Sequence, residues 1–316
     1  MWLGWILGSA FLLSVYDLCK KASVRDNAVF PCLLGSTLTG WCTVTAFLLC
    51  RGELSAAVAV PAKTAALLLV KSCLVGGSWT ATYMALRTLP ITSAAPIRAT
   101  GPLWTLLGAV LLFGEMPTAV QAAGMALALT GCWLFSLSAK HEGVSFWHSK
   151  AIALAFVGTF LGSCSALYDK RLLQQMHIPT GTVLWWFMGG MCVIYAVAVM
   201  RGLRGFRGFR WFRGFRGFRW FRGLGELRGE MEGMEKFEWR WSIPLVGVLL
   251  AASDACYFSA ISTPDAKISV LSLIRRSSVI FTFLVGGAVF REKNLKRKAF
   301  ALLFILLGVL LLCLKR

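Results

Sequence analysis

The chain alternates between long apolar runs and short polar connections. Each run holds about 17 to 25 residues, the length that an α-helix needs to cross a hydrocarbon core of roughly 30 Å. This pattern predicts an all-α integral membrane protein with ten transmembrane helices. The expected helices cover residues 2–18, 28–50, 64–86, 91–113, 117–138, 149–167, 180–200, 241–263, 266–290 and 296–314.

The composition agrees with this pattern. Of the 316 residues, 57% are hydrophobic and only 15% are charged, whereas charged residues make up about a quarter of a soluble domain. No Lys or Arg precedes the first apolar run and no small-residue cleavage site follows it, so we expect a membrane helix there rather than a signal peptide. We therefore expect a multi-pass protein, and we place it in the plasma membrane.

The sequence contains no motif that supplies the chemistry of an enzyme. Its ten cysteines are scattered without C-x-x-C spacing, and its three histidines form no metal-ligand pattern. The G-x-S-x-G motif and the phosphate-binding loop are both missing from the sequence. We therefore expect a protein that is not an enzyme and that needs no metal or cofactor.

Charged motifs recur between the two halves of the chain. The aligned pairs are Arg98 with Arg275 and Glu115 with Glu292, at a shift of 177 residues, and Asp17 with Asp169, at a shift of 152 residues. Each of the two aspartates follows a tyrosine near the end of the first expected helix of its half. Chance gives apolar matches easily but matched charges rarely, so the recurrence indicates an internal repeat.

We divide the chain into a first five-helix repeat, residues 1–140, and a second five-helix repeat, residues 141–316. An insertion over residues 201–240 accounts for most of the difference between the two shifts. Because five is odd, the second copy must enter the membrane from the opposite side, which makes the repeats inverted. Inverted repeats occur in many secondary transporters, whose substrate site lies near the bilayer midplane at the repeat interface.

The segments PITSAAPIRATGPLWTLLGAVLLFGE and AKISVLSLIRRSSVIFTFLVGGAVFREKNL, together with VYDLCKK and LYDKRLL, resemble EamA-type members of the drug/metabolite transporter superfamily. The resemblance covers nearly the whole chain except residues 201–240. It implies a ten-helix basket around a central cavity, and alternating access without ATP hydrolysis. It also implies transport of small polar metabolites such as amino-acid-like solutes, with export as the expected direction.

Several charged and polar side chains fall inside the apolar runs. An arginine placed as deeply as Arg98 costs at least about 2.5 kcal/mol unless it meets water or a partner. Small and polar residues share its helical face, and such a face either lines a cavity or packs against another helix. If Arg98 lines a cavity, Arg98→Gln should abolish transport and leave folding intact. The candidate cavity residues are Arg98, Thr105, Arg275, Thr282 and Trp79, with Lys71 as a further candidate.

Asp254 is the most deeply placed carboxylate, about midway along its expected helix. A single carboxylate at such a depth is suited to couple proton movement to transport. The alternative is a plain ion pair with Arg275 or Arg276. We expect the other carboxylates at the membrane edges to be helix-end charges, namely Asp17, Glu115, Asp169 and Glu292.

The insertion contains the unit GFRGFRWFR twice in tandem, over residues 205–213 and 214–222. Arginine at every third position does not follow one face of a helix, and the glycines disfavour any helix. Residues 201–222 could contact anionic lipid, with arginine supplying charge and aromatic rings entering the interface. The alternative is a duplicated low-complexity loop that is tolerated because it faces water. We expect no nucleic-acid partner, since no folded nucleic-acid-binding module accompanies the arginines.

Two arguments about orientation conflict. Most Lys and Arg residues follow the odd-numbered expected helices, which would place both termini outside the cytosol. Ten-helix members of the resembled family usually have both termini in the cytosol, so the orientation stays open. The expected partners are a small-molecule substrate and the lipid bilayer. The alternatives to a metabolite transporter are a lipid-translocating protein and a non-transporting membrane scaffold or receptor.

Overall fold

The computed structural model describes residues 2–101, 103–104, 107, 118–140, 149–172, 176–203, 237–261, 275, 278–291 and 294–313. Within these residues the chain forms helices and no strand. The helices are α1 (Trp2–Val24), α2 (Val29–Cys50), α3 (Leu54–Val58), α4 (Ala62–Thr88), α5 (Ile91–Ala99), α7 (Ala119–Lys140), α8 (Lys150–Lys170), α9 (Thr180–Leu203), α11 (Ser242–Ile261), α13 (Ser278–Val289) and α14 (Leu295–Cys313).

Five helices in the described part of the chain are long and apolar enough to cross a membrane. These spans are Leu3–Val24, Val29–Cys50, Ala62–Thr88, Lys150–Asp169 and Thr180–Met200. Shorter apolar stretches occur in α7, α11 and α13. The all-α fold is thus confirmed with five candidate spans, whereas ten crossings stay a prediction.

The first helix is longer than the sequence pattern predicted. We expected it to end at residue 18, where the charged residues begin, but α1 continues to Val24. The charges do not stop the helix because they find partners inside the protein: Asp17, Lys20 and Lys21 are all buried. A short helix that the pattern missed, α3, follows α2.

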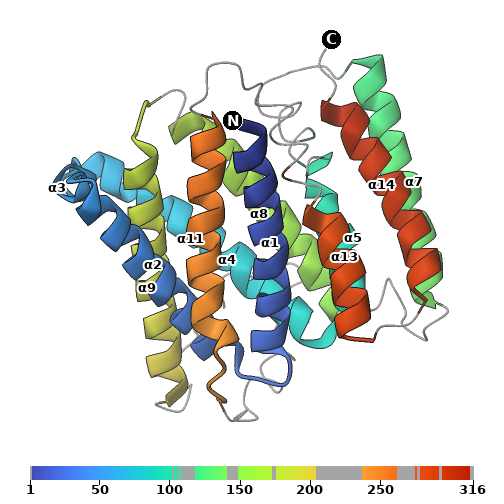
Figure 1. Ribbon diagram of the computed structural model, residues 1–316, viewed down its shortest axis with the longest axis horizontal. Helices are drawn as coiled ribbons and strands as arrows, with labels where there is room; N and C mark the ends of the chain where they lie inside the picture. The colour runs from blue at the N-terminus through green and yellow to red at the C-terminus, as the bar shows by residue number, and fades with distance from the viewer. Residues whose placement is uncertain are drawn as a thin grey trace, which may run out of the picture.

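The long helices lie side by side in one bundle (Figure 1). Helix α1 packs against α11, α4 against α8, α2 against α9, α5 against α13, and α7 against α14. Each of these pairs joins a helix from residues 1–140 to a helix from residues 141–316. Contacts between the two parts of the chain therefore hold the bundle together along its whole width.

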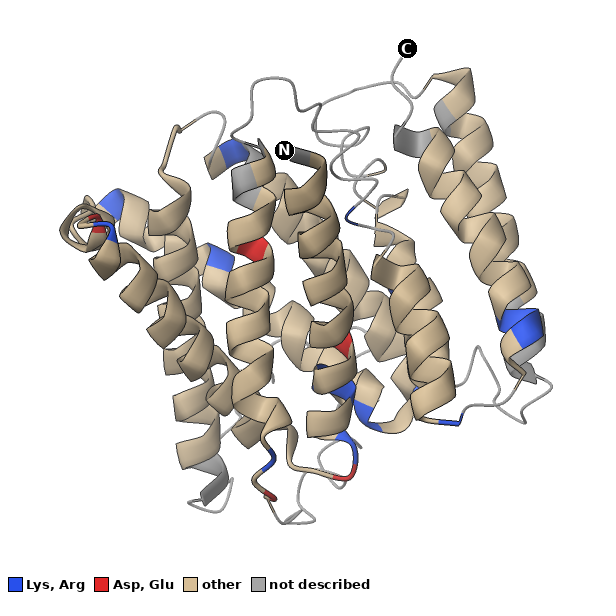
Figure 2. Ribbon diagram, viewed as in Figure 1, with Lys and Arg blue, Asp and Glu red and all other residues tan. Residues whose placement is uncertain are grey.

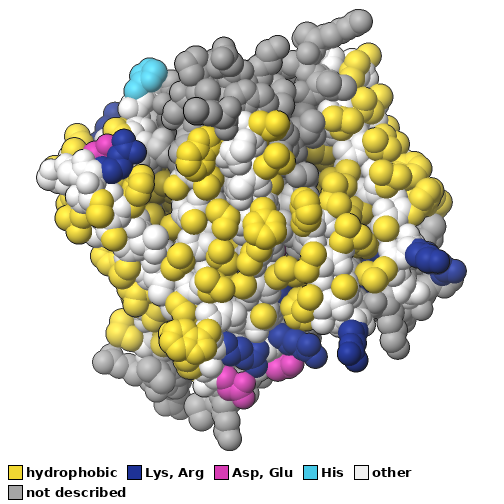
Figure 3. Space-filling model, viewed as in Figure 1, with side chains coloured by type: hydrophobic (Ala, Val, Ile, Leu, Met, Phe, Trp, Pro, Cys, Tyr) yellow, Lys and Arg dark blue, Asp and Glu magenta, His cyan; other side chains and the backbone are white. Residues whose placement is uncertain are grey.

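The outer surface of the bundle is apolar. Large hydrophobic side chains are exposed along the helices, among them Phe11, Trp133, Val193 and Leu284. Figure 3 shows hydrophobic side chains covering the middle of one face, with charged side chains gathered mainly along its edges. Figure 2 shows few charges between the helix ends. A soluble protein rarely exposes so large an apolar surface, so this surface is suited to contact lipid.

Glycine allows the closest helix contacts. A Cβ atom built at Gly158 on α8 would lie 2.5 Å from the Thr82 Oγ1 atom and 3.0 Å from the Ser78 carbonyl oxygen on α4. The Ser78 hydroxyl donates a hydrogen bond of 2.7 Å to the Gly158 carbonyl across the same contact. By contrast, Gly4 and Gly8 on α1 share the same GxxxG spacing, but among the described residues none lies within 4 Å of such a Cβ. The GxxxG pattern therefore marks a tight contact in α8 but not in α1.

Gly158→Ala should lower the free energy of unfolding by about 1–3 kcal/mol, because the added methyl group overpacks the contact between α4 and α8. Gly8→Ala is the matched control: it should leave stability unchanged or raise it slightly, since alanine favours a helix more than glycine does. Thermal or denaturant unfolding of the purified variants measures both. Equal effects of the two substitutions would contradict the packing argument.

Candidate functional site

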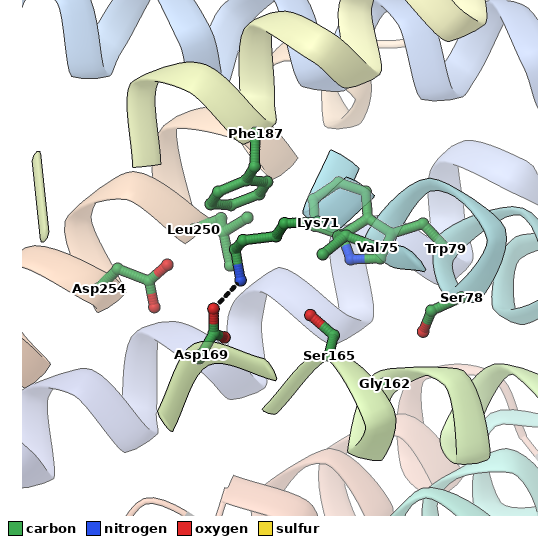
Figure 4. A pocket seen from close by; sticks show the side chains of 10 residues that line it. All are labelled: Lys71, Val75, Ser78, Trp79, Gly162, Ser165, Asp169, Phe187, Leu250 and Asp254. Carbon is green, nitrogen blue, oxygen red and sulfur yellow. Dashed lines mark hydrogen bonds and ion pairs between the residues drawn. The ribbon is translucent and has the colours of Figure 1, made fainter. Parts of the chain in front are cut away.

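A cavity of about 230 Å³ lies among four helices, α4, α8, α9 and α11 (Figure 4). Its lining residues are Lys71, Val75, Ser78 and Trp79 on α4, Gly162, Ser165 and Asp169 on α8, Phe187 on α9, and Leu250 and Asp254 on α11. On α4, α8 and α11 the lining residues recur at spacings of about one turn, so a single face of each of these three helices points at the cavity. Three of the ten residues that line the cavity are charged, namely Lys71, Asp169 and Asp254.

Lys71 and Asp169 form an ion pair at the wall of the cavity. The Lys71 side chain is only 5% exposed, whereas that of Asp169 is 33% exposed. The Lys71 Nζ atom also lies 5.0 Å from the centre of the Phe187 ring, which adds a cation–π contact. Figure 4 shows the ammonium group beside Asp169, with the Asp254 carboxylate across from it. The pair joins α4 to α8, and it keeps a deeply placed lysine from being an isolated buried charge.

Asp254 and Arg275 form a second ion pair. Both side chains are mostly buried, and the Arg275 guanidinium stacks 4.2 Å from the centre of the Tyr257 ring. The Arg275 Nε atom has no hydrogen-bond partner among the residues that the structure describes. Of the two partners that the sequence allowed for Asp254, the structure therefore shows Arg275, and Arg276 lies outside the described residues.

Arg98 and Asp17 form a third ion pair, with 2.5 Å between the Arg98 Nη1 and Asp17 Oδ1 atoms. This pair joins α5 to α1. The Asp17 side chain is 3% exposed and the Arg98 side chain 30% exposed, so the carboxylate is the more deeply buried partner. The Ser163 hydroxyl of α8 donates a hydrogen bond of 2.9 Å to the Gly101 carbonyl, which further anchors the end of α5.

Two lysines beside Asp17 are also buried. The Lys20 Nζ atom lies 4.8 Å from the centre of the Tyr83 ring, 5.3 Å from that of Tyr16 and 5.7 Å from that of Trp79. The Lys21 Nζ atom donates hydrogen bonds to the carbonyls of Leu86 and Leu89 at the end of α4. The end of α1 is therefore tied to α4 and α5 by charged groups.

The structure brings together some of the candidates from the sequence and not others. Trp79, Asp254 and Lys71 line the cavity. Arg98 and Arg275 lie elsewhere among the described residues, each paired with a carboxylate of another helix. Thr282 is buried in α13, and its hydroxyl has no hydrogen-bond partner in the described part of the chain. Thr105, Glu115, Glu292 and most of the insertion over residues 201–240 lie outside the described residues.

Sequence reasoning expected Asp17 and Asp169 to be helix-end charges. Asp169 does lie in the last turn of α8, but it also lines the cavity. Asp17 lies inside α1 and is buried. Ser165 and Phe187 were not among the candidates, although the three-residue and four-residue spacings that join Gly162, Ser165 and Asp169 could have placed all three on one helical face.

Comparisons with known proteins agree with this architecture. The model of the EamA-like transporter family matches residues 1–137 of the chain. A solved crystal structure of another protein is 17% identical and superposes with a TM-score of 0.59, over 96% of this chain and 94% of that chain. A search of curated proteins finds no match.

The apolar helices and the family match define an integral, multi-pass membrane protein. The match confirms, over residues 1–137, the resemblance to EamA-type transporters that the sequence motifs indicated, and it points to a membrane transporter. The solved structure shares the fold of this chain over nearly its whole length.

Proposed function

We propose that the chain is a secondary transporter of small polar metabolites and that the cavity among α4, α8, α9 and α11 is its substrate site. The observation that carries this proposal is the presence of Lys71, Asp169 and Asp254 around one cavity inside an apolar bundle. Charged groups at membrane depth are costly, and they are mostly found where they serve transport. At about 230 Å³ the cavity is smaller than the roughly 300–1,000 Å³ of drug-sized sites, which favours a small solute.

We further propose ten crossings arranged as two inverted repeats that work by alternating access. The helix contacts support this arrangement. The first helix of one half packs against the third of the other in both directions, as α1 with α11 and as α8 with α4. The second helix of each half also packs against the third helix of the other half, as α2 with α11 and as α9 with α4. Such reciprocal contacts are what a two-fold relation between the halves would produce. Export is the direction that the family resemblance implies.

Trp79→Ala should reduce substrate flux by about tenfold or more, because the change removes an aromatic wall of the proposed site and about 1.4 kcal/mol of binding corresponds to each factor of ten. Flux is measured by counterflow in proteoliposomes that contain the purified protein, across a panel of amino acids and related solutes. Trp133→Ala, at an exposed position on α7, is the matched control and should keep wild-type flux. Equal flux in both variants would contradict the assignment of the cavity.

Deleting residues 205–222 should leave flux within about twofold of wild type, because loops tolerate such changes when the membrane core is kept. The same proteoliposome assay measures this. Loss of flux on the deletion would show that residues 205–222 are needed for transport. A full-length protein that transports no solute would favour the scaffold alternative, and one that transports a labelled lipid but no soluble solute would favour the lipid-translocating alternative.

A further inference from the structure

The equivalent charges of the two halves are paired differently. Asp17 is equivalent to Asp169 by the internal repeat, and Arg98 to Arg275. In the first half the aspartate and the arginine form an ion pair with each other. In the second half both residues have other partners: Asp169 is paired with Lys71, and Arg275 with Asp254. The repeat thus holds the same two residues in two different arrangements.

In a transporter with inverted repeats, a difference in pairing between the two halves is expected in each state. Such a transporter alternates by exchanging the conformations of its two halves. A contact formed by the first half in one state should then be formed by the second half in the opposite state. Asp169 lines the cavity. It is paired with Lys71 and not with Arg275, the arginine of its own half. Asp17 and Arg98 hold the end of α1 against α5, and neither is among the residues that line the cavity.

We propose that Asp169 is a gate residue that exchanges Lys71 for Arg275 when the transporter changes state, while the pair between Asp17 and Arg98 separates. This inference rests on the proposed function and on the proposed inverted repeats. It goes beyond them by naming the contacts that distinguish the two states.

The exchange leaves none of the four charged residues Lys71, Asp169, Asp254 and Arg275 without a partner. Asp169 and Asp254 line the same cavity, and the Lys71 ammonium lies beside one and across from the other (Figure 4). When Arg275 moves to Asp169, Lys71 can move to Asp254, so that two ion pairs exist before and after. The cost of an isolated buried charge is thereby avoided. The Nε atom of Arg275 has no partner among the described residues, so the guanidinium has a donor left for a new contact.

In the first half a buried lysine can replace Arg98 as the cation near Asp17. Lys20 follows Asp17 by three residues on α1, is 2% exposed, and lies among the rings of Tyr16, Trp79 and Tyr83. When Arg98 leaves, Lys20 is the buried cation one helical turn from Asp17. Trp79 also lines the cavity, so a movement of Lys20 changes the contacts of a residue in the proposed substrate site.

The test compares a variant in which Asp169 can pair only with Arg275 with a variant in which that pair cannot form. A Ser165→Cys change places a thiol on the cavity wall, and its labelling by a membrane-impermeant maleimide, applied to each side of sealed vesicles in turn, reports which side the cavity faces. The background also carries Cys164→Ala, because this native cysteine is adjacent to residue 165, and mass spectrometry of the labelled peptide then separates the new thiol from the other native cysteines. In this background Lys71→Met/Asp254→Asn removes the charged partners that Asp169 and Arg275 have in the structure, so that these two residues can form an ion pair only with each other, and it should shift labelling away from the original side by about fivefold or more. Adding Asp169→Asn to this variant removes the acceptor of the exchange, and should shift labelling back toward the original side.

Purely structural ion pairs predict that both variants loosen the same contacts and label alike. Equal labelling of the two variants, or no shift in either, would overturn the exchange. Asp17→Asn gives a second measurement on a different ion pair, that between Asp17 and Arg98: it should shift labelling in the same direction as Lys71→Met/Asp254→Asn. Glu53→Gln, which removes the partner of Arg51 in an exposed ion pair, is the control and should change nothing.

The labelling needs no substrate, which separates the two proposals. Opposite shifts without flux of any solute would overturn the transporter and support the exchange. Normal flux without opposite shifts would overturn the exchange and leave the transporter standing.

Discussion

Arg98→Gln should lower the free energy of unfolding by about 3–5 kcal/mol, the cost of removing one partner from a buried ion pair. The change leaves the Asp17 carboxylate, which is 3% exposed, without its cation. The sequence alone favoured a different result, loss of transport with folding intact, because it gave Arg98 no partner. Unfolding of the detergent-purified variant by heat or denaturant measures the effect.

The double variant Asp17→Asn/Arg98→Gln tests the cause of that loss. Since it removes both charges, it should recover most of the stability that Arg98→Gln loses. Asp17→Asn alone should cost less than Arg98→Gln, because the Arg98 side chain is 30% exposed and can turn toward water. A double variant that is as unstable as the sum of its single variants would mean that the two residues act independently.

The apolar pattern predicted the helices well for a physical reason. A helix that contacts lipid must be apolar along its length, so the run itself marks the element, as in α2, α4 and α9. The pattern located α1 but not its end, because Asp17, Lys20 and Lys21 are satisfied by partners that only the folded chain supplies. The GxxxG spacing in α1 and α8 was equally ambiguous, since only the neighbouring helix decides whether a glycine lies in a close contact.

The candidate site was only partly predictable. Asp254 and Trp79 could be chosen by depth, because a polar or aromatic side chain within an apolar run needs an explanation. The partner of Asp169 could not be chosen, since Lys71 lies 98 residues away and on a different helix. The repeat even indicates a different partner, Arg275, by analogy with the pair between Asp17 and Arg98. The charged residues could therefore be chosen from the sequence, whereas the pairing of Lys71 with Asp169 depends on how α4 packs against α8.

Asp254 is the candidate for the coupling proton. If it carries that proton, Asp254→Asn should abolish uphill transport driven by a proton gradient and lower counterflow much less, because the asparagine oxygen still accepts a hydrogen bond from Arg275 or Lys71. Counterflow needs only that the loaded carrier changes state, whereas uphill transport also needs a group that binds and releases the proton in each cycle. The expected loss of uphill flux is about tenfold or more, equivalent to at least 1.4 kcal/mol. Both fluxes are measured in the same proteoliposomes, with and without an imposed pH difference.

Arg275→Gln separates this role from the ion pair that Asp254 forms in the structure. It breaks the same pair but keeps the carboxylate, so uphill transport should retain its dependence on the proton gradient even where the rate falls. If both variants lose uphill flux and counterflow together, the pair serves the change of state, and the coupling proton must be carried elsewhere. If Asp254→Asn keeps full uphill flux, Asp254 acts only as the partner of Arg275. The location of Asp254 at the cavity wall makes the first result the expected one, because a proton site that shares the cavity with the substrate allows each to influence the binding of the other.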